Sequence, residues 1–270
     1  MCDTPVKLKS GEIVPCGLCS DCLATHRNGW IRRLYSEASS SVHSYFITLT
    51  YHDENLTFAD SDSPVLNYRD VQLFFKRARK SGQKFKYFGC GEYGEHNGRP
   101  HYHCLIFYDD TKFNIEKLLS HWTLGFTDVQ FLSEANIRYT TKDMLKEREL
   151  FQDVPRSLKP HIFCSKGIGI SFVKEYEQFY KNNPYELPKM AFDGKGVSLP
   201  RYFKEKIFSK YERNIHRRRM EIIRRHSLSH NKNLCREEIQ DLEREARLHV
   251  QKVEAKKQKR LKINHFNRKL

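Results

Sequence analysis

Apolar and polar residues alternate along four short stretches of this chain, the pattern of strands that turn one face toward a core. Residues 44–51 alternate aromatic or aliphatic side chains with hydroxyl groups, which predicts a strand. Residues 84–92 and 101–108 form two further strand-like runs, and the Gly, Asn and Pro between them predict a hairpin. A fourth strand is expected at residues 127–132.

Between these strands, apolar residues recur every three or four positions, which predicts amphipathic helices. The helices are expected at residues 25–36, 68–81, 115–122 and 134–150, with a later one at 172–180. The resulting order, β-α-β-β-α-β-α, is typical of an α+β fold. In ferredoxin-like domains of this kind an antiparallel sheet carries its helices on one face.

Positive charge is concentrated toward the C-terminal end of the chain. The formal net charge over 270 residues is +15. Residues 201–270 hold 22 Lys and Arg against 9 Asp and Glu, a net charge of +13, which leaves +2 for residues 1–200. A basic surface attracts polyanions because phosphates release their counterions on binding. Nucleic acid is therefore the expected partner, ahead of an acidic membrane surface.

These patterns divide the chain into three expected parts. A Cys-rich segment with a helix occupies residues 1–40, a catalytic domain residues 41–200, and a basic helical nucleic-acid-binding tail residues 201–270. No apolar run approaches the roughly 20 residues of a membrane span, and the start of the chain lacks the charged-then-apolar pattern of a signal peptide. We therefore expect a cytosolic protein that does not engage membranes.

Several basic groups are candidates for phosphate contacts. In the tail they are Arg217–Arg219, Arg224, Arg225 and Lys256–Arg260; elsewhere they are Arg99 and Lys76–Lys80. For Arg99 and Lys76–Lys80 a plain solvated face is the more common interpretation. Phe203, Phe208 and Tyr211 could stack on bases, but packing in a core is the more common role of such aromatics.

His101 and His103 give the most specific chemical signal. Side chains two apart on a strand point to the same face, about 7 Å apart, so the two imidazoles can converge on one metal ion. Glu92 ends the partner strand of the hairpin and can supply a carboxylate. Such a set leaves coordination positions open, as a catalytic metal requires. It suits Mg²⁺, Mn²⁺ or Zn²⁺, and phosphate chemistry favours Mg²⁺ or Mn²⁺.

Two alternatives stay open at this point. Glu95, inside the turn, competes with Glu92 as the third ligand, although strand geometry favours Glu92. An isolated His-x-His in a strand is also more commonly a pair of surface histidines than a metal site. Here the Gly-Arg-Pro before the pair, the carboxylate across the turn and the apolar run after it favour the metal site.

Tyr139 and Lys142 lie three residues apart on the helix predicted from residue 134 and therefore share a face. A phenol, with a pKa of about 10, attacks phosphorus poorly unless a cation favours the phenolate or neutralises the phosphate. In-line attack by Tyr139 would leave the 5′ phosphate on the tyrosine and free a 3′ hydroxyl, so the strand could be rejoined without ATP. A Tyr-x-x-Lys alone is a weak signal, and only its combination with the histidines supports this prediction.

Cys16, Cys19 and Cys22 follow one another at intervals that favour joint binding of Zn²⁺. With Cys2 or His26 as a fourth ligand, they would fix a segment too short to have its own core. Reduced cysteines packed beside the first helix are an equally good interpretation. The other four cysteines are scattered, which argues against a disulfide framework.

Three segments resemble, in order, the rolling-circle replication motifs of the HUH endonuclease superfamily. They are Phe-Ile-Thr-Leu-Thr-Tyr51, Gly-Glu-Tyr-Gly-Glu-His-Asn-Gly-Arg-Pro-His-Tyr-His103 and Arg-Tyr-Thr-Thr-Lys142. More closely, the chain resembles the replication initiators of gokushovirus-type microviruses, bacteriophages with circular single-stranded DNA. The likeness extends to Pro-Cys-Gly-Leu-Cys-Ser-Asp-Cys22, Ser-Lys-Gly-Ile-Gly169 and Leu-Pro-Arg-Tyr-Phe203, and so covers most of residues 1–203.

The resemblance implies an antiparallel palm and a site-specific single-strand DNA nickase and ligase that forms a 5′-phosphotyrosine. It assigns metal binding to His101, His103 and Glu92, the nucleophile to Tyr139, and the lysine that follows it to Lys142. Some relatives carry a second tyrosine one helical turn before the nucleophile, where this chain has Ala135. Closing the circle is therefore expected to need a second protomer or another acceptor.

The implied partner is phage origin DNA. The sequence has no Gly-x-x-x-x-Gly-Lys-Ser/Thr motif, so a host helicase, together with host DNA polymerase, is expected to assist in the cytoplasm of the bacterial host. A single-tyrosine transposase or plasmid relaxase would use the same chemistry on different DNA. A non-catalytic basic nucleic-acid-binding module is the alternative from another class, and it predicts aromatic residues exposed on the sheet and no metal dependence.

Overall fold

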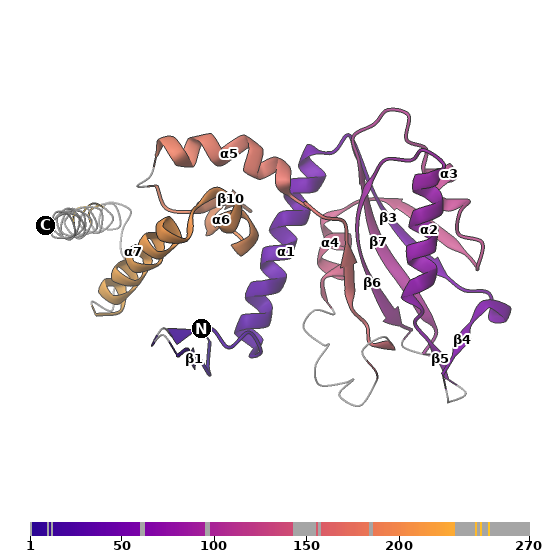
Figure 1. Cartoon of the computed structure of the whole chain (residues 1–270), viewed down its shortest axis with the longest axis horizontal. Helices are drawn as coiled ribbons and strands as arrows, with labels where there is room; N and C mark the ends of the chain where they lie inside the picture. The colour runs from indigo at the N-terminus through magenta and orange to yellow at the C-terminus, as the bar shows by residue number, and fades with distance from the viewer. Residues whose placement is uncertain are drawn as a thin grey trace, which may run out of the picture. The chain divides into compact units, whose positions relative to one another are not determined.

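Figure 1 shows a computed structural model of the chain. The structure describes residues 2–9, 11, 13–59, 63–94, 98–142, 155, 158–183 and 186–229, together with residues 241, 244 and 248. The chain divides into two compact units, Met1–Lys174 and Glu175–Leu270, and each is described by itself. The division expected from the sequence, at residues 40 and 200, stays a prediction about domains.

The first unit is built on a five-stranded sheet in which every neighbouring pair of strands is antiparallel. The strand order is β8-β3-β7-β6-β9. The strands are β3 (His43–Thr50), β6 (Lys86–Tyr93), β7 (Pro100–Tyr108), β8 (Thr127–Phe131) and β9 (Ile162–Cys164). The predicted α+β class and antiparallel sheet are confirmed, and β9 is the strand that the periodicity did not indicate.

Four helices accompany this sheet, and they lie on both of its faces (Figure 1). They are α1 (Ser20–Ser40), α2 (Tyr68–Lys80), α3 (Ile115–Leu119) and α4 (Glu134–Thr140). On one face, α2 and the segment around α3 pack with buried residues of β3 and β7 such as Ile47 and Tyr102. On the other face α4 contacts both β7 and α1.

The expectation of helices on one face was therefore wrong, and the burial of β7 gives the reason. Eight of its nine residues are buried, His101 being the half-buried one, so apolar side chains leave both sides of the strand. Phe88 of β6 is fully buried on the second face, where its ring lies 5.0 Å from that of Trp30 in α1. A sheet with two apolar faces needs a cover on each.

Several predicted helix boundaries differ from those observed. The first helix, expected at residues 25–36, is longer, and the third, expected at 115–122, is shorter. α4 ends at Thr140, with Thr141 as its C-cap. The part of the predicted 134–150 helix that follows residue 142 lies outside the described residues.

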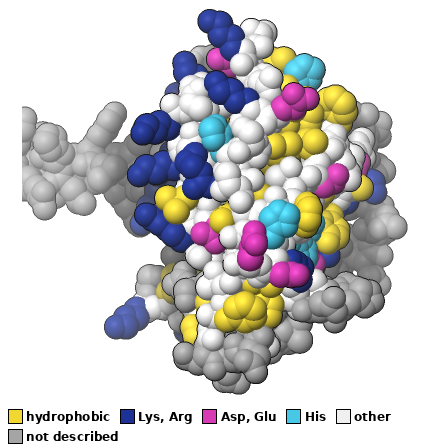
Figure 2. All heavy atoms as spheres, turned by 90° about the vertical axis from the view of Figure 1, so that its right-hand side faces the viewer, with side chains coloured by type: hydrophobic (Ala, Val, Ile, Leu, Met, Phe, Trp, Pro, Cys, Tyr) yellow, Lys and Arg dark blue, Asp and Glu magenta, His cyan; other side chains and the backbone are white. Residues whose placement is uncertain are grey.

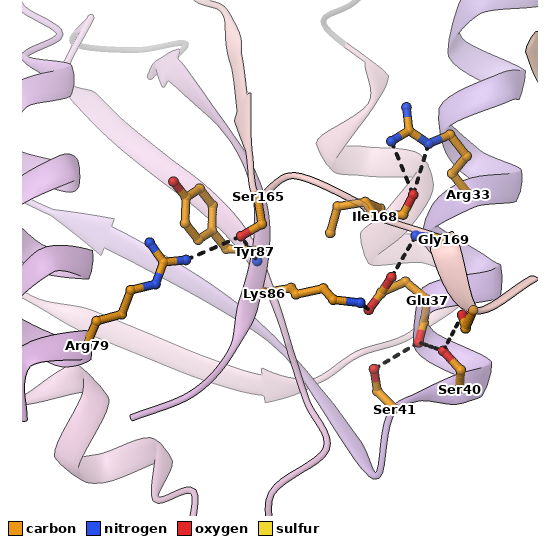
Figure 3. A network of polar contacts seen from close by, with 11 residues as sticks. Arg33, Glu37, Ser40, Ser41, Arg79, Lys86, Tyr87, Ser165, Ile168 and Gly169 are labelled. Carbon is orange, nitrogen blue, oxygen red and sulfur yellow. Dashed lines mark hydrogen bonds and ion pairs between the residues drawn. The ribbon is translucent and has the colours of Figure 1, made fainter. Parts of the chain in front are cut away.

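A polar network joins α1, β6 and the segment that follows β9 (Figure 3). Glu37 of α1 is 1% exposed; its carboxylate pairs with Lys86 Nζ at 2.5 Å and accepts a hydrogen bond from the Gly169 amide at 2.6 Å. Arg33 donates to the Ile168 carbonyl at 3.1 and 3.2 Å. The Ser-Lys-Gly-Ile-Gly169 stretch noted in the sequence thus anchors the sheet's last strand to α1.

Three two-stranded hairpins and further helices complete the described chain. The hairpins are β1 (Val6–Lys7) with β2 (Ile13–Val14), β4 (Thr57–Phe58) with β5 (Pro64–Val65), and β10 (Lys189–Phe192) with β11 (Lys195–Ser198). A 3₁₀ turn, η1 (Asp53–Asn55), precedes β4, and α5 (Ile170–Asn182), α6 (Arg201–Ile207) and α7 (Lys210–Ser229) are the remaining helices. In the described part of the chain, no helix combines the length and the apolar character needed to cross a membrane.

The second unit has a small core of its own. Phe203 and Phe208 are buried, as expected for packing and not for base stacking, while Tyr211 is 45% exposed. Arg219 is also fully buried, so the expectation that all of Arg217–Arg219 contact phosphates was wrong for its third member. Lys256–Arg260 lies outside the described residues.

Basic residues also gather on the face that α2 covers. Figure 2 views the molecule from the side of α2 and α3, and Lys and Arg side chains line one margin of that view. Lys76, Arg79 and Lys80 are exposed on α2. Because α2 packs on the sheet face opposite the two histidines, the Lys76–Lys80 run does not line the candidate site described below.

The Glu37–Lys86 pair gives a prediction about stability. Replacing Lys86 by Met should cost about 2 kcal/mol of unfolding free energy, because the buried carboxylate of Glu37 then keeps its charge without a cation. The double variant Glu37→Gln, Lys86→Met should recover most of that loss, since no buried charge remains. Urea denaturation measures both, and a Lys86→Met protein as stable as the wild type would contradict this role.

His216 gives a prediction about acid. It is 5% exposed, and burial, helped by the nearby Arg219 guanidinium, lowers its pKa to about 4. The unfolded chain takes up this proton at a pKa of about 6.5, so stability falls as the pH drops from about 6.5 toward 4. We expect a loss of about 2 kcal/mol in α6 and α7 at pH 5 relative to pH 7. Hydrogen exchange, corrected for its intrinsic pH dependence, measures this loss; a His216→Phe variant with the same acid sensitivity would contradict the assignment.

Candidate metal and nucleophile site

The register of three neighbouring strands sets the framework of the site. Glu92 on β6 lies directly opposite His101 on β7, and Thr48 on β3 lies directly opposite His103. Residues directly opposite each other in an antiparallel pair point to the same face, and so do His101 and His103, two apart on one strand. All four side chains therefore project from one face of the sheet.

The ligand atoms of this group converge as the sequence predicted. His103 Nε2 lies 3.5 Å from Glu92 Oε2, and His101 Nε2 lies 3.9 Å from the same oxygen. One atom from each of the three side chains can be chosen so that all lie within 4.8 Å of one another. Glu95, the rival third ligand, lies outside the described residues.

Hydrogen bonds to the far side of each ring fix how the imidazoles face the group. His101 Nδ1 is 3.0 Å from the Arg99 carbonyl oxygen, which can only accept, so Nδ1 carries the proton and Nε2 a lone pair. His103 Nδ1 is 3.2 Å from Thr48 Oγ1. His103 Nε2 is buried and makes no hydrogen bond within the described chain. A buried imidazole nitrogen aimed at a carboxylate fits a metal ligand.

Tyr139 reaches the same carboxylate from the other side. It lies near the end of α4, a helix whose start is fixed by a capping box between Ser133 and Asn136. Its hydroxyl donates to Glu92 Oε2 at 3.2 Å, and its ring meets that of His103 edge-on at 5.0 Å. The side chain is still 39% exposed, so a ligand can reach it from solvent.

Lys142 joins the group although it does not lie on the helix as expected. α4 has ended at Thr140, and Lys142 follows its C-cap. Its ammonium is 3.0 Å from Glu92 Oε1 and 3.7 Å from the centre of the Tyr139 ring. The turn after α4, and not the helical repeat, brings the lysine and the tyrosine together.

Burial and charge set the protonation states. Burial lowers the pKa of His103 to about 4, with a further contribution from His101, so this imidazole is neutral near pH 7. Burial raises the pKa of Glu92, but its hydrogen bond and charge contact with Lys142 and the nearby histidines outweigh that effect, and the net pKa is lowered. The resting group thus presents neutral imidazole and an ionised carboxylate, the forms that bind metal ions.

The tyrosine is harder to ionise than a free phenol. Burial raises the pKa of Tyr139, and the Glu92 carboxylate adds to the rise against the opposing effect of Lys142. Burial acts to lower the pKa of Lys142, but its contacts with Tyr139 and Glu92 raise it above its usual value. The phenol is therefore protonated at rest, and the lysine is a lasting positive charge beside it.

Two residues of this site were not identified from the sequence. Thr48 orients His103, and Phe46, on the same strand, stacks on the His103 ring at 5.3 Å between centroids. The alternation of residues 44–51 placed both on one face, but which strand neighbours β7 was not known. Arg99, a candidate phosphate contact, instead pairs with Asp53 at 2.7 Å and donates to the Tyr51 carbonyl at 2.5 Å.

The predicted cysteine cluster also forms. The sulfurs of Cys2, Cys16, Cys19 and Cys22 all lie within 4.8 Å of one another. His26, the alternative fourth ligand, is not part of the group. The two clusters are built from different elements and share no residue.

Comparison with known proteins gives a consistent set of relatives. A family model that describes replication-associated proteins of the ORF2 type matches residues 44–148. Replication-associated protein ORF2 of Spiroplasma virus 4 is 31% identical over 221 residues, covering 71% of this chain and 67% of that protein. Replication-associated protein ORF4 of Chlamydia phage 1 is 26% identical over 220 residues, covering 71% and 53%.

A third relative is replication-associated protein VP4 of Bdellovibrio phage phiMH2K, 27% identical over 217 residues, covering 71% of this chain and 66% of that protein. The chain thus spans between about half and two thirds of the length of these relatives. Residues 44–148 include all five of the site residues Glu92, His101, His103, Tyr139 and Lys142.

The contact between Thr48 and His103 leads to a prediction. Thr48→Val keeps the shape of the side chain but removes the oxygen that orients the imidazole, and should weaken Mn²⁺ binding about 10- to 100-fold. Thr50→Val is the matched control, because Thr50 lies opposite His101 on the same face and its hydroxyl donates to the Phe126 carbonyl. Calorimetric titration with Mn²⁺ measures the affinities; equal affinity in both variants would show that Thr48 has no such role.

Proposed function

The chain belongs to the family of replication-associated proteins of microviruses, and on that basis we propose that it is a site-specific single-strand DNA nickase and ligase. It starts rolling-circle replication of a circular single-stranded phage genome through a 5′-phosphotyrosine. The observation that carries this proposal is the Tyr139 hydroxyl, 3.2 Å from a carboxylate that also faces two imidazoles. A phosphodiester bound there would meet a nucleophile, a cation and metal ligands together.

The proposed reaction exchanges one phosphodiester for another. The Tyr139 oxygen attacks phosphorus, the new bond joins tyrosine to the 5′ phosphate, and the bond to the 3′ oxygen breaks. The phenol loses its proton, for which Glu92 Oε2 already accepts a hydrogen bond, and the leaving 3′ oxygen gains one. The reverse attack by a 3′ hydroxyl rejoins a strand without ATP.

Lys142 and the metal ligands serve the phosphate in this proposal. The Lys142 ammonium, next to both the phenol and Glu92, offsets negative charge that grows on the phosphate as the tyrosine attacks. His101, His103 and Glu92 fit a divalent ion, for which we propose Mg²⁺ or Mn²⁺. Such an ion, when bound, supplies Lewis-acid polarisation of the scissile phosphate.

Tyr139 acts alone in its helix. Ala135 takes the position one turn earlier on α4, and its small side chain is exposed. A second phenol is therefore not available at that position for the second strand transfer. We propose that a second protomer or another acceptor closes the circle.

The partners follow from the replication role of the family. We propose phage origin DNA as the substrate, with a host helicase to unwind the duplex and host DNA polymerase to extend the freed 3′ hydroxyl in the host cytoplasm. A single-tyrosine transposase or relaxase shares this chemistry, and its preference for hairpins at element ends over a phage origin would distinguish it.

A non-catalytic nucleic-acid-binding module is the second candidate, because aromatic residues are exposed along β8. Phe131 is 73% exposed and Phe126, just before the strand, is 64% exposed, and rings in such positions can stack on bases. These residues are equally able to hold single-stranded DNA for a nickase. Covalent attachment therefore decides between the two functions.

We predict a covalent protein–DNA adduct when the chain is incubated with circular single-stranded phage DNA and Mn²⁺. Tyr139→Phe should abolish it, because no hydroxyl remains to attack, while DNA binding persists. Tyr176→Phe, which alters a tyrosine of equal exposure (39%), is the matched control and should leave the adduct unchanged. The readout is a shifted band on a denaturing gel after nuclease digestion.

The same assay tests the ligands and the lysine. Removing Mn²⁺ with a chelator should abolish the adduct, and Lys142→Met should slow its formation by about 10²-fold. An adduct that survives in Tyr139→Phe would show that another residue is the nucleophile. Tight DNA binding without any adduct in the wild type would favour the non-catalytic module.

A further inference from the structure

The N-terminal segment is folded without an apolar core. Among the described residues before Ile31, none is buried. The apolar side chains Val6, Leu8, Ile13 and Leu18 are between 43% and 69% exposed. Strands of two residues, β1 and β2, make too few contacts to hold this hairpin. Something other than apolar packing must fix the segment in place.

Four cysteine sulfurs lie where such a fixing point would be. Cys2, Cys16, Cys19 and Cys22 are all half-buried, and their sulfurs lie within 4.8 Å of one another. Cys16 Sγ and Cys22 Sγ are 3.9 Å apart. A disulfide requires about 2.05 Å, whereas four thiolates about 2.3 Å from a tetrahedral zinc ion are about 3.8 Å from one another.

The backbone around these sulfurs favours thiolates. The amides of Leu18 and Cys19 both donate to Cys16 Sγ at 3.3 Å, and the Cys16 amide donates to Cys2 Sγ at 3.2 Å. Gly17, at φ +76°, gives the left-handed turn that aims the first two amides at one sulfur. These hydrogen bonds, that of Leu18 first, lower the pKa of Cys16 to about 5.

The start of α1 adds to this effect. Cys19 is the N-cap of the helix, where its side chain makes no capping hydrogen bond, and Cys22 lies in the first turn. The N-terminal end of a helix carries partial positive charge, which stabilises thiolate over thiol. The two sulfurs thus gain from the helix what a capping oxygen would otherwise supply to it.

We propose that Cys2, Cys16, Cys19 and Cys22 bind one Zn²⁺ ion in a closed structural site that ties the N-terminal hairpin to the start of α1. Four thiolates select zinc over Mg²⁺ or Mn²⁺, which prefer oxygen ligands. With all four positions taken by protein, this site has no room for a substrate. It is therefore separate in chemistry from the His101, His103 and Glu92 group.

The proposed ion also has a positioning role, because α1 supports α4. Arg27 of α1 donates to the Arg138 carbonyl at 3.1 Å, one residue before Tyr139, and the two helices pack together. Fixing the start of α1 therefore steadies the helix that carries the phenol. Loss of zinc should loosen α1 and α4 while leaving α2, on the other face of the sheet, unaffected.

The experiment is a Co²⁺ titration of the metal-free, reduced full chain, because cobalt replaces zinc and thiolate ligation gives a near-ultraviolet charge-transfer band. We expect that band to saturate at one Co²⁺ per chain and to disappear when one equivalent of Zn²⁺ is added. Cys16→Ser, Cys19→Ser should lose the band. Cys164→Ser, outside the cluster, and His101→Gln, His103→Gln should both keep it.

Hydrogen exchange on the wild type supplies a second measurement that does not depend on variants folding. Adding Zn²⁺ to the metal-free chain should protect amides of residues 13–24 and of α4, with no change in α2. A wild-type chain without the charge-transfer band, or with all four thiols reacting freely at saturating Zn²⁺, would overturn the proposal. These readouts do not involve DNA cleavage, so this proposal and the proposed nickase activity can fail independently.

Discussion

The pairing of Glu92 with His101 across the β6–β7 hairpin is the contact that the candidate site depends on. Side chains alternate along a strand, so a slip of one residue would turn the carboxylate to the face covered by α2. β3 and β9 hold the hairpin on both outer edges, and buried residues on both faces of β7 fix the register. The chemistry of one face therefore depends on packing on both.

Glu92 is shared among three kinds of partner: two imidazoles, a phenol and an ammonium. At rest its charge is balanced by Lys142, and the half-buried group is close to neutral, which limits the cost of burying it. Binding of a divalent ion would leave a net positive group facing solvent beside Tyr139. A phosphodiester anion is the natural ligand for such a group, in keeping with the replication role of the family.

Much of the fold could be predicted because local periodicity decides it. Alternation located β3, β6, β7 and β8, and the two-residue spacing of the histidines placed them on one face. What could not be predicted depends on neighbours distant in sequence. Thr48 is part of the site only because β3 pairs with β7. The cover on both faces was in fact indicated by the apolar run at Cys104–Phe107, which has no polar alternation.

Other residues took different roles for reasons that no local pattern reveals. Lys142 reaches Tyr139 through the turn after α4 and not along the helix. Arg99 holds a loop through Asp53, and Arg219 is enclosed in the second unit. A basic residue in a sequence can serve a phosphate or the protein's own structure, and only its surroundings distinguish the two.

Diffraction from crystals soaked in Mn²⁺, collected at the manganese absorption edge, tests most directly whether this group is a metal site beside a nucleophile. We predict one anomalous peak bonded to His101 Nε2, His103 Nε2 and a Glu92 oxygen, with the Tyr139 side chain next to it. A peak held by other residues, or no peak at a Mn²⁺ concentration that supports DNA cleavage, would contradict the proposed site.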